Sequence, residues 1–171
     1  MASTYKIPIK PIVPALLLLF VVAVTAAVAW CFRSGLTWSG ISLIAIAGPL
    51  SMLYWYMLYI NPKRASITVA DEGILLAAPP FASAVIPWAS VEKVFRGNLK
   101  TDPALAVAKS RKIMQFAGYH SGLVELTGGE EAVIVANRPD VLCLQTAERI
   151  YALGPSDLDG FVHDVEAARE Q

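Results

Sequence analysis

The chain has 171 residues, of which 56% are hydrophobic and 16% are charged, and its mean hydropathy of +0.53 excludes an ordinary soluble domain. The apolar excess lies in the first third, and the rest is mildly acidic, which gives no reason to expect a nucleic-acid partner. The two cysteines, Cys31 and Cys143, lie in unrelated segments, and this placement favours neither a disulfide nor a metal site.

The first apolar segment, residues 11–32, carries no charge and follows Lys6 and Lys10. The small residues at 27–29 resemble a signal-peptidase site. However, an uncharged run of this length is long for a signal-peptide core, and a second apolar segment follows shortly after it. We therefore predict that residues 11–32 form an uncleaved transmembrane helix.

The second apolar segment spans residues 38–60, and about 20 apolar residues at ~1.5 Å each cross a hydrocarbon core of ~30 Å. We expect Asn61 and Pro62 to end this helix. Aromatic and basic side chains gather where the two spans would meet the headgroups. The predicted interface anchors are Lys10, Tyr54, Trp55, Tyr59, Lys63 and Arg64.

Positive charges predict the topology of the two spans. Two lysines precede the first span and two basic residues follow the second, with only Arg33 between them. We therefore expect residues 1–64 to form a two-helix membrane hairpin with both termini in the cytoplasm, and residues 65–171 to form a cytoplasmic domain. No ionisable residue lies within either span, which disfavours a transporter or channel.

After residue 64 the pattern changes to short strands separated by turns. The first two form a predicted hairpin, in which Gly73 supplies the positive φ of the turn. An Asp102-Pro103 pair predicts a helix start, followed by a short helix or an ordered loop over 104–109. Ser156 is predicted to cap a final helix with one apolar stripe. We expect antiparallel strands at residues 66–69, 74–78, 84–88, 91–95, 113–117, 122–126, 132–136, 141–145 and 150–153, and the stripe at Leu158, Phe161, Val162 and Val165.

Three motifs in this order resemble those of bacterial pleckstrin-homology-like (PH-like) domains. They are Ile86-Pro-Trp-Ala-Ser-Val-Glu-Lys-Val94, Gly118-Tyr-His-Ser-Gly122, and Tyr151-Ala-Leu-Gly-Pro-Ser-Asp-Leu-Asp-Gly-Phe161. The resemblance covers residues 66–168. It implies a membrane α-helical hairpin followed by a mainly-β PH-like barrel or sandwich capped by a C-terminal α-helix, in a multi-pass protein of the bacterial inner membrane. It implies no single function, because this fold serves lipid binding, peptide binding and scaffolding.

The charges depart from those of phosphoinositide-binding PH domains, which carry a basic motif near the first hairpin turn. That turn contains Asp71 and Glu72 here, so inositol-lipid recognition by that motif is disfavoured. Basic residues instead concentrate within 93–112, where they form either a candidate surface for anionic lipids or a partner, or an ordinary solvated loop and strand edge. These residues are Lys93, Arg96, Lys100, Lys109, Arg111 and Lys112.

Candidate catalytic chemistry is sparse. His120 and Ser121 lie between glycines, but a hydrolase elbow places serine centrally and connects a strand to a helix. No metal-ligand spacing occurs, and we predict no catalytic residue, metal or cofactor. The sequence thus favours a membrane-anchored, non-enzymatic module that binds a membrane protein partner or a second copy of itself. The alternative is anionic-lipid sensing through residues 93–112.

Overall fold

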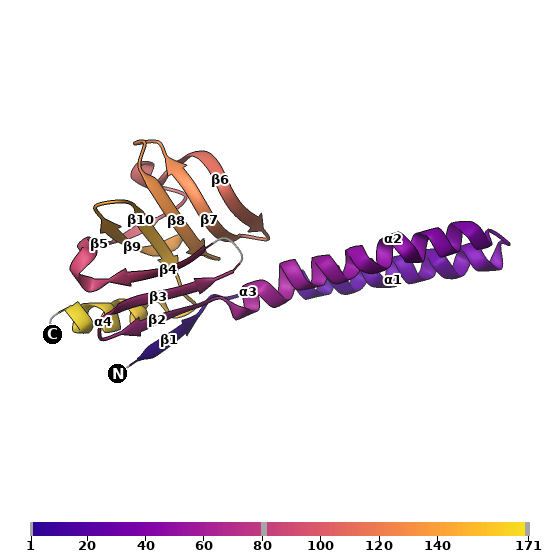
Figure 1. Cartoon of the computed structure of the whole chain (residues 1–171), viewed down its shortest axis with the longest axis horizontal. Coiled ribbons are helices and arrows are strands. Elements are labelled where there is room, and N and C mark those ends of the chain that lie inside the picture. Colours follow the sequence, from indigo (N-terminus) through magenta and orange to yellow (C-terminus); the bar gives the residue numbers. More distant parts are fainter. Residues whose placement is uncertain (1, 80–81, 170–171) are drawn as a thin grey trace. The chain divides into compact units, whose positions relative to one another are not determined.

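The computed structural model describes residues 2–79 and 82–169, which form two compact units (Figure 1). One unit is helical and comprises Lys10–Asn61. The other is mainly β and combines residues 2–9 with the chain from Pro62 onward. The short segment before the first helix therefore belongs to the globular unit, whereas the sequence analysis grouped it with the membrane hairpin.

The helical unit is a hairpin of two long helices packed side by side (Figure 1). Helix α1 is Ile12–Arg33 and α2 is Thr37–Trp55; a π-helical turn, η1 (Tyr56–Ile60), and a short α3 (Asn61–Arg64) continue it. The backbone N–H of Asn61 donates to Tyr56 O, the wider spacing of a π turn. The helix therefore passes through Pro62 to Arg64 and does not end at residue 60.

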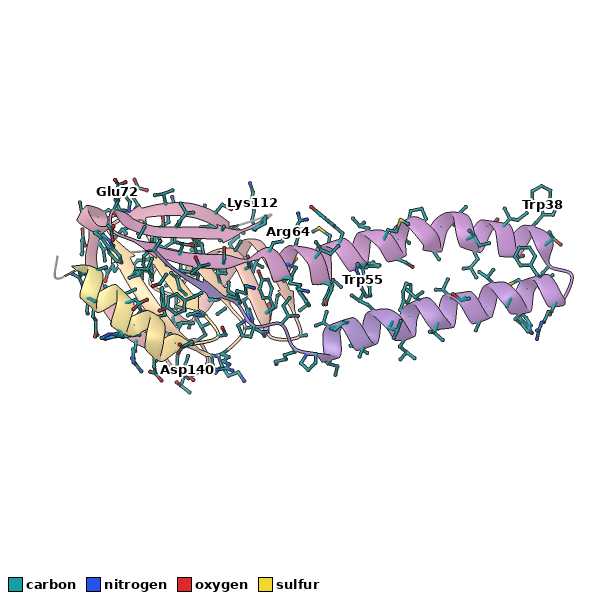
Figure 2. All side chains as sticks on the ribbon, turned by 90° about the horizontal axis from the view of Figure 1, so that it is seen from below. Trp38, Trp55, Arg64, Glu72, Lys112 and Asp140 are labelled. Atoms are coloured by element: carbon teal, nitrogen blue, oxygen red, sulfur yellow. The ribbon has the colours of Figure 1, made fainter. Side chains whose placement is uncertain are left out.

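Apolar side chains cover the outside of both helices (Figure 2). Only 11% of the most apolar window of α1 and 6% of that of the second helix are buried. A core helix of a soluble protein would be mostly buried, and these helices are mostly exposed. By length and composition, both helices suffice to cross a membrane.

The first sheet of the globular unit has four antiparallel strands in the order β1-β2-β3-β4. The strands are β1 (Ser3–Lys6), β2 (Ser66–Ala70), β3 (Gly73–Ala78) and β4 (Ala82–Pro87). The predicted β2–β3 hairpin is confirmed. Strand β1 was not predicted; it precedes the first helix in sequence, yet Ser3 pairs with Val69 and Lys6 with Ser66.

The second sheet has six strands in the order β5-β9-β10-β8-β7-β6. Its strands are β5 (Val91–Asn98), β6 (Val107–Phe116), β7 (Tyr119–Leu126), β8 (Glu131–Ala136), β9 (Asp140–Thr146) and β10 (Ile150–Gly154). Strand β10 inserts between β9 and β8 and runs parallel to β8, so the expectation of a purely antiparallel domain was wrong. The described strands form a PH-like sandwich without a closed barrel.

The central strands of the second sheet are buried on both faces. Every residue from 132 to 136 and from 141 to 144 is buried. Alternate residues of these strands join one core cluster, which includes Ile134, Cys143 and Ala152. The residues between them, such as Val135 and Leu142, point to the opposite face. Burial on both faces explains why these segments are continuous apolar runs instead of alternating ones.

Of the two structures predicted for 104–109, a short helix or an ordered loop, the helix does not form beyond one turn. Asp102 Oδ1 accepts the backbone N–H of Ala104 at 3.0 Å, as the predicted cap requires. Only a 3₁₀ turn follows, η3 (Pro103–Leu105). Leu105 is 1% exposed and belongs to the core cluster, and the N–H and hydroxyl of Thr127 both donate to Ala106 O. These tertiary contacts extend the chain into β6 in place of a helix.

The C-terminal helix α4 (Leu158–Arg169) contacts β2 and β9. Three of the four residues of its predicted stripe, Phe161, Val162 and Val165, are buried, whereas Leu158 is half-buried. The cap differs from the prediction. Asp157 Oδ1 accepts the N–H of Gly160 at 3.0 Å, whereas the hydroxyl of Ser156 donates to Lys6 O at 3.0 Å. Ser156 therefore holds the N-terminal segment and leaves the helix cap to Asp157.

Candidate interaction surfaces

The basic residues predicted to form one binding surface lie on the two opposite edges of the six-stranded sheet. Lys93 and Arg96 are on β5, whereas Lys109, Arg111 and Lys112 are on β6. Lys100 lies in the connection between these strands. Four other strands separate the two edges, so the strand order does not assemble a continuous basic strip.

Both arginines of this set form salt bridges with acidic side chains of the same domain. Arg96 pairs with Asp159 at 2.9 Å, and Arg111 bridges Glu125 at 3.1 Å and Glu131 at 2.9 Å. The ammonium group of Lys93 lies 5.3 Å from the centre of the Phe95 ring. These contacts reduce the positive charge that the edges can offer to a lipid headgroup.

The β6 lysines also have a structural explanation. Residues 107–112 are exposed at the edge of the sheet, and the pairing of β6 with β7 shifts register twice in this segment. Charged side chains and bulges are the features by which exposed edge strands avoid pairing with other chains. The basic character of 109–112 is therefore consistent with protection of an edge.

Residues 3–8 form an N-terminal clamp, held by contacts to distant parts of the globular unit. The Tyr5 ring packs edge-on against Phe161 at 5.3 Å, and its hydroxyl donates to Asp164 Oδ2 at 2.6 Å. Asn137 Nδ2 donates to Pro8 O, and Ser156 holds Lys6 as described above. The clamp thus joins β1 to α4, to the loop between β8 and β9, and to the connection between β10 and α4.

The Tyr5–Asp164 pair shifts the acidity of both groups. Burial, followed by the hydrogen bond to Asp164, raises the pKa of Tyr5 to about 12. The Tyr5 hydroxyl, with a smaller contribution from Ser3, holds the pKa of Asp164 below its ordinary value. Near neutral pH the pair is therefore a phenol donating to a carboxylate, a charge-assisted hydrogen bond.

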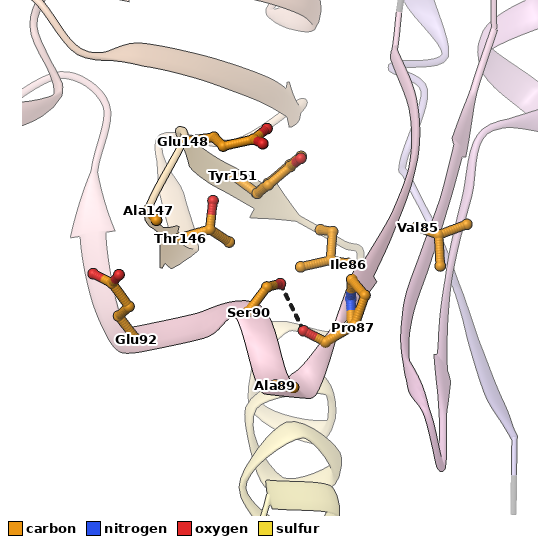
Figure 3. Close-up of a pocket in the computed structure, with 10 residues that line it drawn as sticks. All are labelled: Val85, Ile86, Pro87, Ala89, Ser90, Glu92, Thr146, Ala147, Glu148 and Tyr151. Atoms are coloured by element: carbon orange, nitrogen blue, oxygen red, sulfur yellow. Dashed lines mark hydrogen bonds between the residues drawn. The ribbon is translucent and has the colours of Figure 1, made fainter.

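A pocket of about 390 Å³ lies beside the end of β4 (Figure 3). The 3₁₀ turn η2 (Trp88–Ser90) forms one wall. The Trp88 indole N–H fixes this turn by donating to Ala70 O at 3.0 Å, and the Ser90 hydroxyl donates to Pro87 O at 2.8 Å. The turn between β9 and β10 forms the opposite wall. The lining residues are Val85, Ile86, Pro87, Ala89, Ser90, Glu92, Thr146, Ala147, Glu148 and Tyr151.

A second pocket, of about 440 Å³, continues around the β9–β10 turn. It shares four lining residues with the first, namely Glu92, Thr146, Ala147 and Glu148. We call these two pockets together the Val85 groove. This groove was not predicted from the sequence. The sequence carries one signal for an exposed apolar surface here. The run of β3 is continuously apolar, so apolar side chains lie on both faces of the first sheet.

An exposed apolar pair lies beside this groove. Among the described residues of the globular unit, the exposed large apolar side chains are Leu75, Val85 and Val107, at 48%, 67% and 46% exposure. Leu75 and Val85 are directly opposite one another on β3 and β4. Val85 also lines the groove. The Leu75–Val85 pair therefore lies on the outer face of the first sheet, and the Val85 side chain points away from the other side chains that line the pocket (Figure 3).

The predicted interface anchors flank the helical hairpin in the sequence, before α1 and from the end of α2 onward. Trp55 ends α2 and Tyr59 lies in the π turn, with their ring centres 5.2 Å apart. Tyr54 precedes them, Lys63 and Arg64 end α3, and Lys10 precedes α1. Their assignment as headgroup anchors stays a prediction.

The segment between Gly118 and Gly122 is a tight turn and the start of a strand. Ala117 and Gly118 both have positive φ, 46° and 88°, as a two-residue hairpin turn requires. His120 Nδ1 lies 2.9 Å from Gly118 O, and Ser121 is fully buried on β7. In the described part of the chain, no three side chains of the histidine, cysteine or acidic type gather as metal ligands would.

This architecture, a mainly-β sandwich closed by a C-terminal helix, defines a PH-like domain. Residues 65–168 match the family model described as bacterial PH domain, which covers more than half of the chain. The protein therefore belongs to the bacterial PH domain family. PH domains are typically non-catalytic modules that bind proteins or lipids, and no enzyme family is indicated. No curated protein and no solved structure matches the chain.

Proposed function

We propose that this protein is a membrane-anchored, non-enzymatic interaction module, in which two transmembrane helices hold a PH-like domain at the cytoplasmic face, where it binds a membrane protein partner as an accessory subunit. Family membership supports an interaction role, and the exposed apolar surface of both helices supports the anchor. Tethering raises the effective concentration of the domain near its partner, so that even a weak contact suffices.

The observation that carries the anchor proposal is the pairing of β1 with β2. Strand β1 precedes α1 and β2 follows the second helix, yet both are neighbours in one sheet of one compact unit. Strands can pair only in the same compartment, so any membrane crossings of the chain between them must be even in number. Two crossings agree with two apolar helices, and the basic flanks favour the cytoplasm for both ends.

Cysteine labelling tests this topology. In a Cys31→Ser background, single Ala2→Cys, Ser34→Cys and Glu166→Cys variants probe the two ends and the loop between the helices. We expect a membrane-impermeant maleimide to label only the position-34 variant in intact cells whose outer membrane has been opened, and all three after inner-membrane permeabilisation. Labelling of positions 2 and 166 from opposite sides would contradict the paired-strand topology.

A pulldown tests the proposed binding function. The full chain is purified in mild detergent from its native membranes, beside a variant in which residues 10–61 are replaced by a flexible linker, so that β1 can still reach β2. We expect a stoichiometric membrane protein to be retained by both versions, because the domain supplies recognition. Retention by the full chain alone would assign recognition to the helices. Repeated absence of any stoichiometric partner would contradict the proposal.

Anionic-lipid sensing through residues 93–112 takes second place. Three lysines remain available for lipid binding, because they form no ion pair within the described residues: Lys100, Lys109 and Lys112. Lys109 and Lys112 lie on the edge strand β6, where charged side chains also prevent pairing with other chains. Arg96 and Arg111 are matched by carboxylates. Surface basic residues contribute only about 1 kcal/mol each to headgroup attraction, so the divided set supports protein binding better than lipid binding.

A further inference from the structure

The Val85 groove combines an apolar base with an acidic rim. In the pocket beside β4, Ile86 and Pro87 of the strand and Tyr151 of β10 form the apolar part (Figure 3). The exposed Leu75–Val85 pair lies on the other face of the first sheet (Figure 3). A pocket with apolar side chains at its base is the kind of surface that a partner's side chain fills.

The charges around the groove have one predominant sign. The two pockets are lined by four carboxylates and one guanidinium, from Glu92, Glu130, Glu131, Glu148 and Arg149. Glu131 already pairs with Arg111, and Glu148 contacts Arg149 at 3.7 Å with its side chain 83% exposed. Within the described part of the chain, Glu92 and Glu130 form no ion pair. The groove therefore repels an anionic headgroup and attracts a cationic segment.

We propose that the Val85 groove binds a lysine- or arginine-rich juxtamembrane segment of the partner protein, with an apolar side chain in the pocket beside β4 and basic side chains on Glu92 and Glu148. This inference rests on the proposed function. A domain tethered at the cytoplasmic face meets the cytoplasmic loops of other membrane proteins, and these loops are enriched in lysine and arginine near the ends of their spans. Charge complementarity therefore selects this class of segment over lipid.

Peptide binding to the full-length protein tests the groove. The protein is placed in nanodiscs of zwitterionic lipid, which does not itself attract the probe. The probe is a short fluorescent peptide of alternating lysine and leucine with serine spacers, and binding is followed by anisotropy at two salt concentrations. We expect salt-sensitive binding of this peptide and none of a peptide in which glutamate replaces each lysine.

Matched variants locate the binding. We expect Glu92→Gln combined with Glu148→Gln to weaken binding about fivefold and to reduce its salt dependence, since each exposed charge pair contributes modestly. Tyr151→Ser should weaken binding while leaving the salt dependence intact, because it removes an apolar ring from the pocket. The control, Glu72→Gln combined with Glu166→Gln, changes the net charge equally at exposed positions outside the groove and should bind like the unchanged protein.

Three results would overturn the inference. The first is that the groove variant and the control variant weaken peptide binding equally, and the second is that the acidic peptide binds as well as the basic one. The third is that the protein binds vesicles containing anionic lipid more tightly than it binds the basic peptide. The pulldown separates this failure from that of the proposed function. If the Glu92→Gln and Glu148→Gln protein retains the partner as well as the unchanged chain does, the groove is wrong and the function stands. If no version retains a partner, the function itself is wrong.

Discussion

A Phe161→Ala protein will lose about 3–5 kcal/mol of stability in its globular unit. The Phe161 ring is fully buried on α4, which contacts both sheets, and it packs edge-on against Tyr5. Removing it leaves a cavity where the helix, the first sheet and the N-terminal clamp meet. Thermal unfolding of the full-length protein in detergent, with limited proteolysis of the globular unit as the readout, measures the loss.

His163→Ala is the matched control for this prediction. His163 lies two residues away on the same helix and is exposed, so its replacement should change the unfolding midpoint little. A Phe161→Ala protein as resistant to protease as the control would contradict the packing described for α4.

A Gly122→Ala protein will lose about 3 kcal/mol or more. Gly122 has a φ of +149°, and a Cβ there would lie 2.0 Å from the Lys112 carbonyl oxygen and 2.6 Å from Ile113 Cα. Both obstructing atoms are backbone, so relief requires β6 and β7 to separate where their register shifts. We expect lower yield and an earlier protease-sensitive transition in the full-length protein.

Gly128→Ala is the control for that substitution. Gly128 lies in the turn before β8, and a Cβ there meets no atom within 4 Å, so we expect stability close to that of the unchanged protein. Equal behaviour of the two alanine variants would show that β6 and β7 do not approach as closely at Gly122 as the structure has them.

Local patterns were sufficient to predict the helices and most strands. The apolar runs of α1 and α2 and the i, i+3, i+4, i+7 stripe of α4 are strong signals that no tertiary contact overrides. The β2–β3 hairpin carries its own turn residue, Gly73. The short helix that was one alternative for 104–109 does not form, because the burial of Leu105 and the pairing of β6 outweigh a correctly identified cap at Asp102.

Long-range contacts were not predictable from one sequence. Strand β1 is four polar or aromatic residues, and its identity as a strand depends wholly on β2, far along the chain. The parallel β8–β10 pairing likewise leaves no local signal. The same limit applies to the candidate site: the basic residues were found by their number, but only the strand order shows that they occupy two edges, and only folding brings Glu92 next to Glu148.

The pairing of β1 with β2 also sets an order of events during synthesis. Residues 3–6 leave the ribosome first, but their partner strand emerges only after both helices have been made. In the proposed two-span topology, a chain in which only the first helix inserted would hold the two strands on opposite sides of the bilayer, and β2 would keep an unpaired edge open to aggregation or proteolysis. Such a chain could not complete the first sheet, so the fold itself would distinguish it from a chain with both helices inserted.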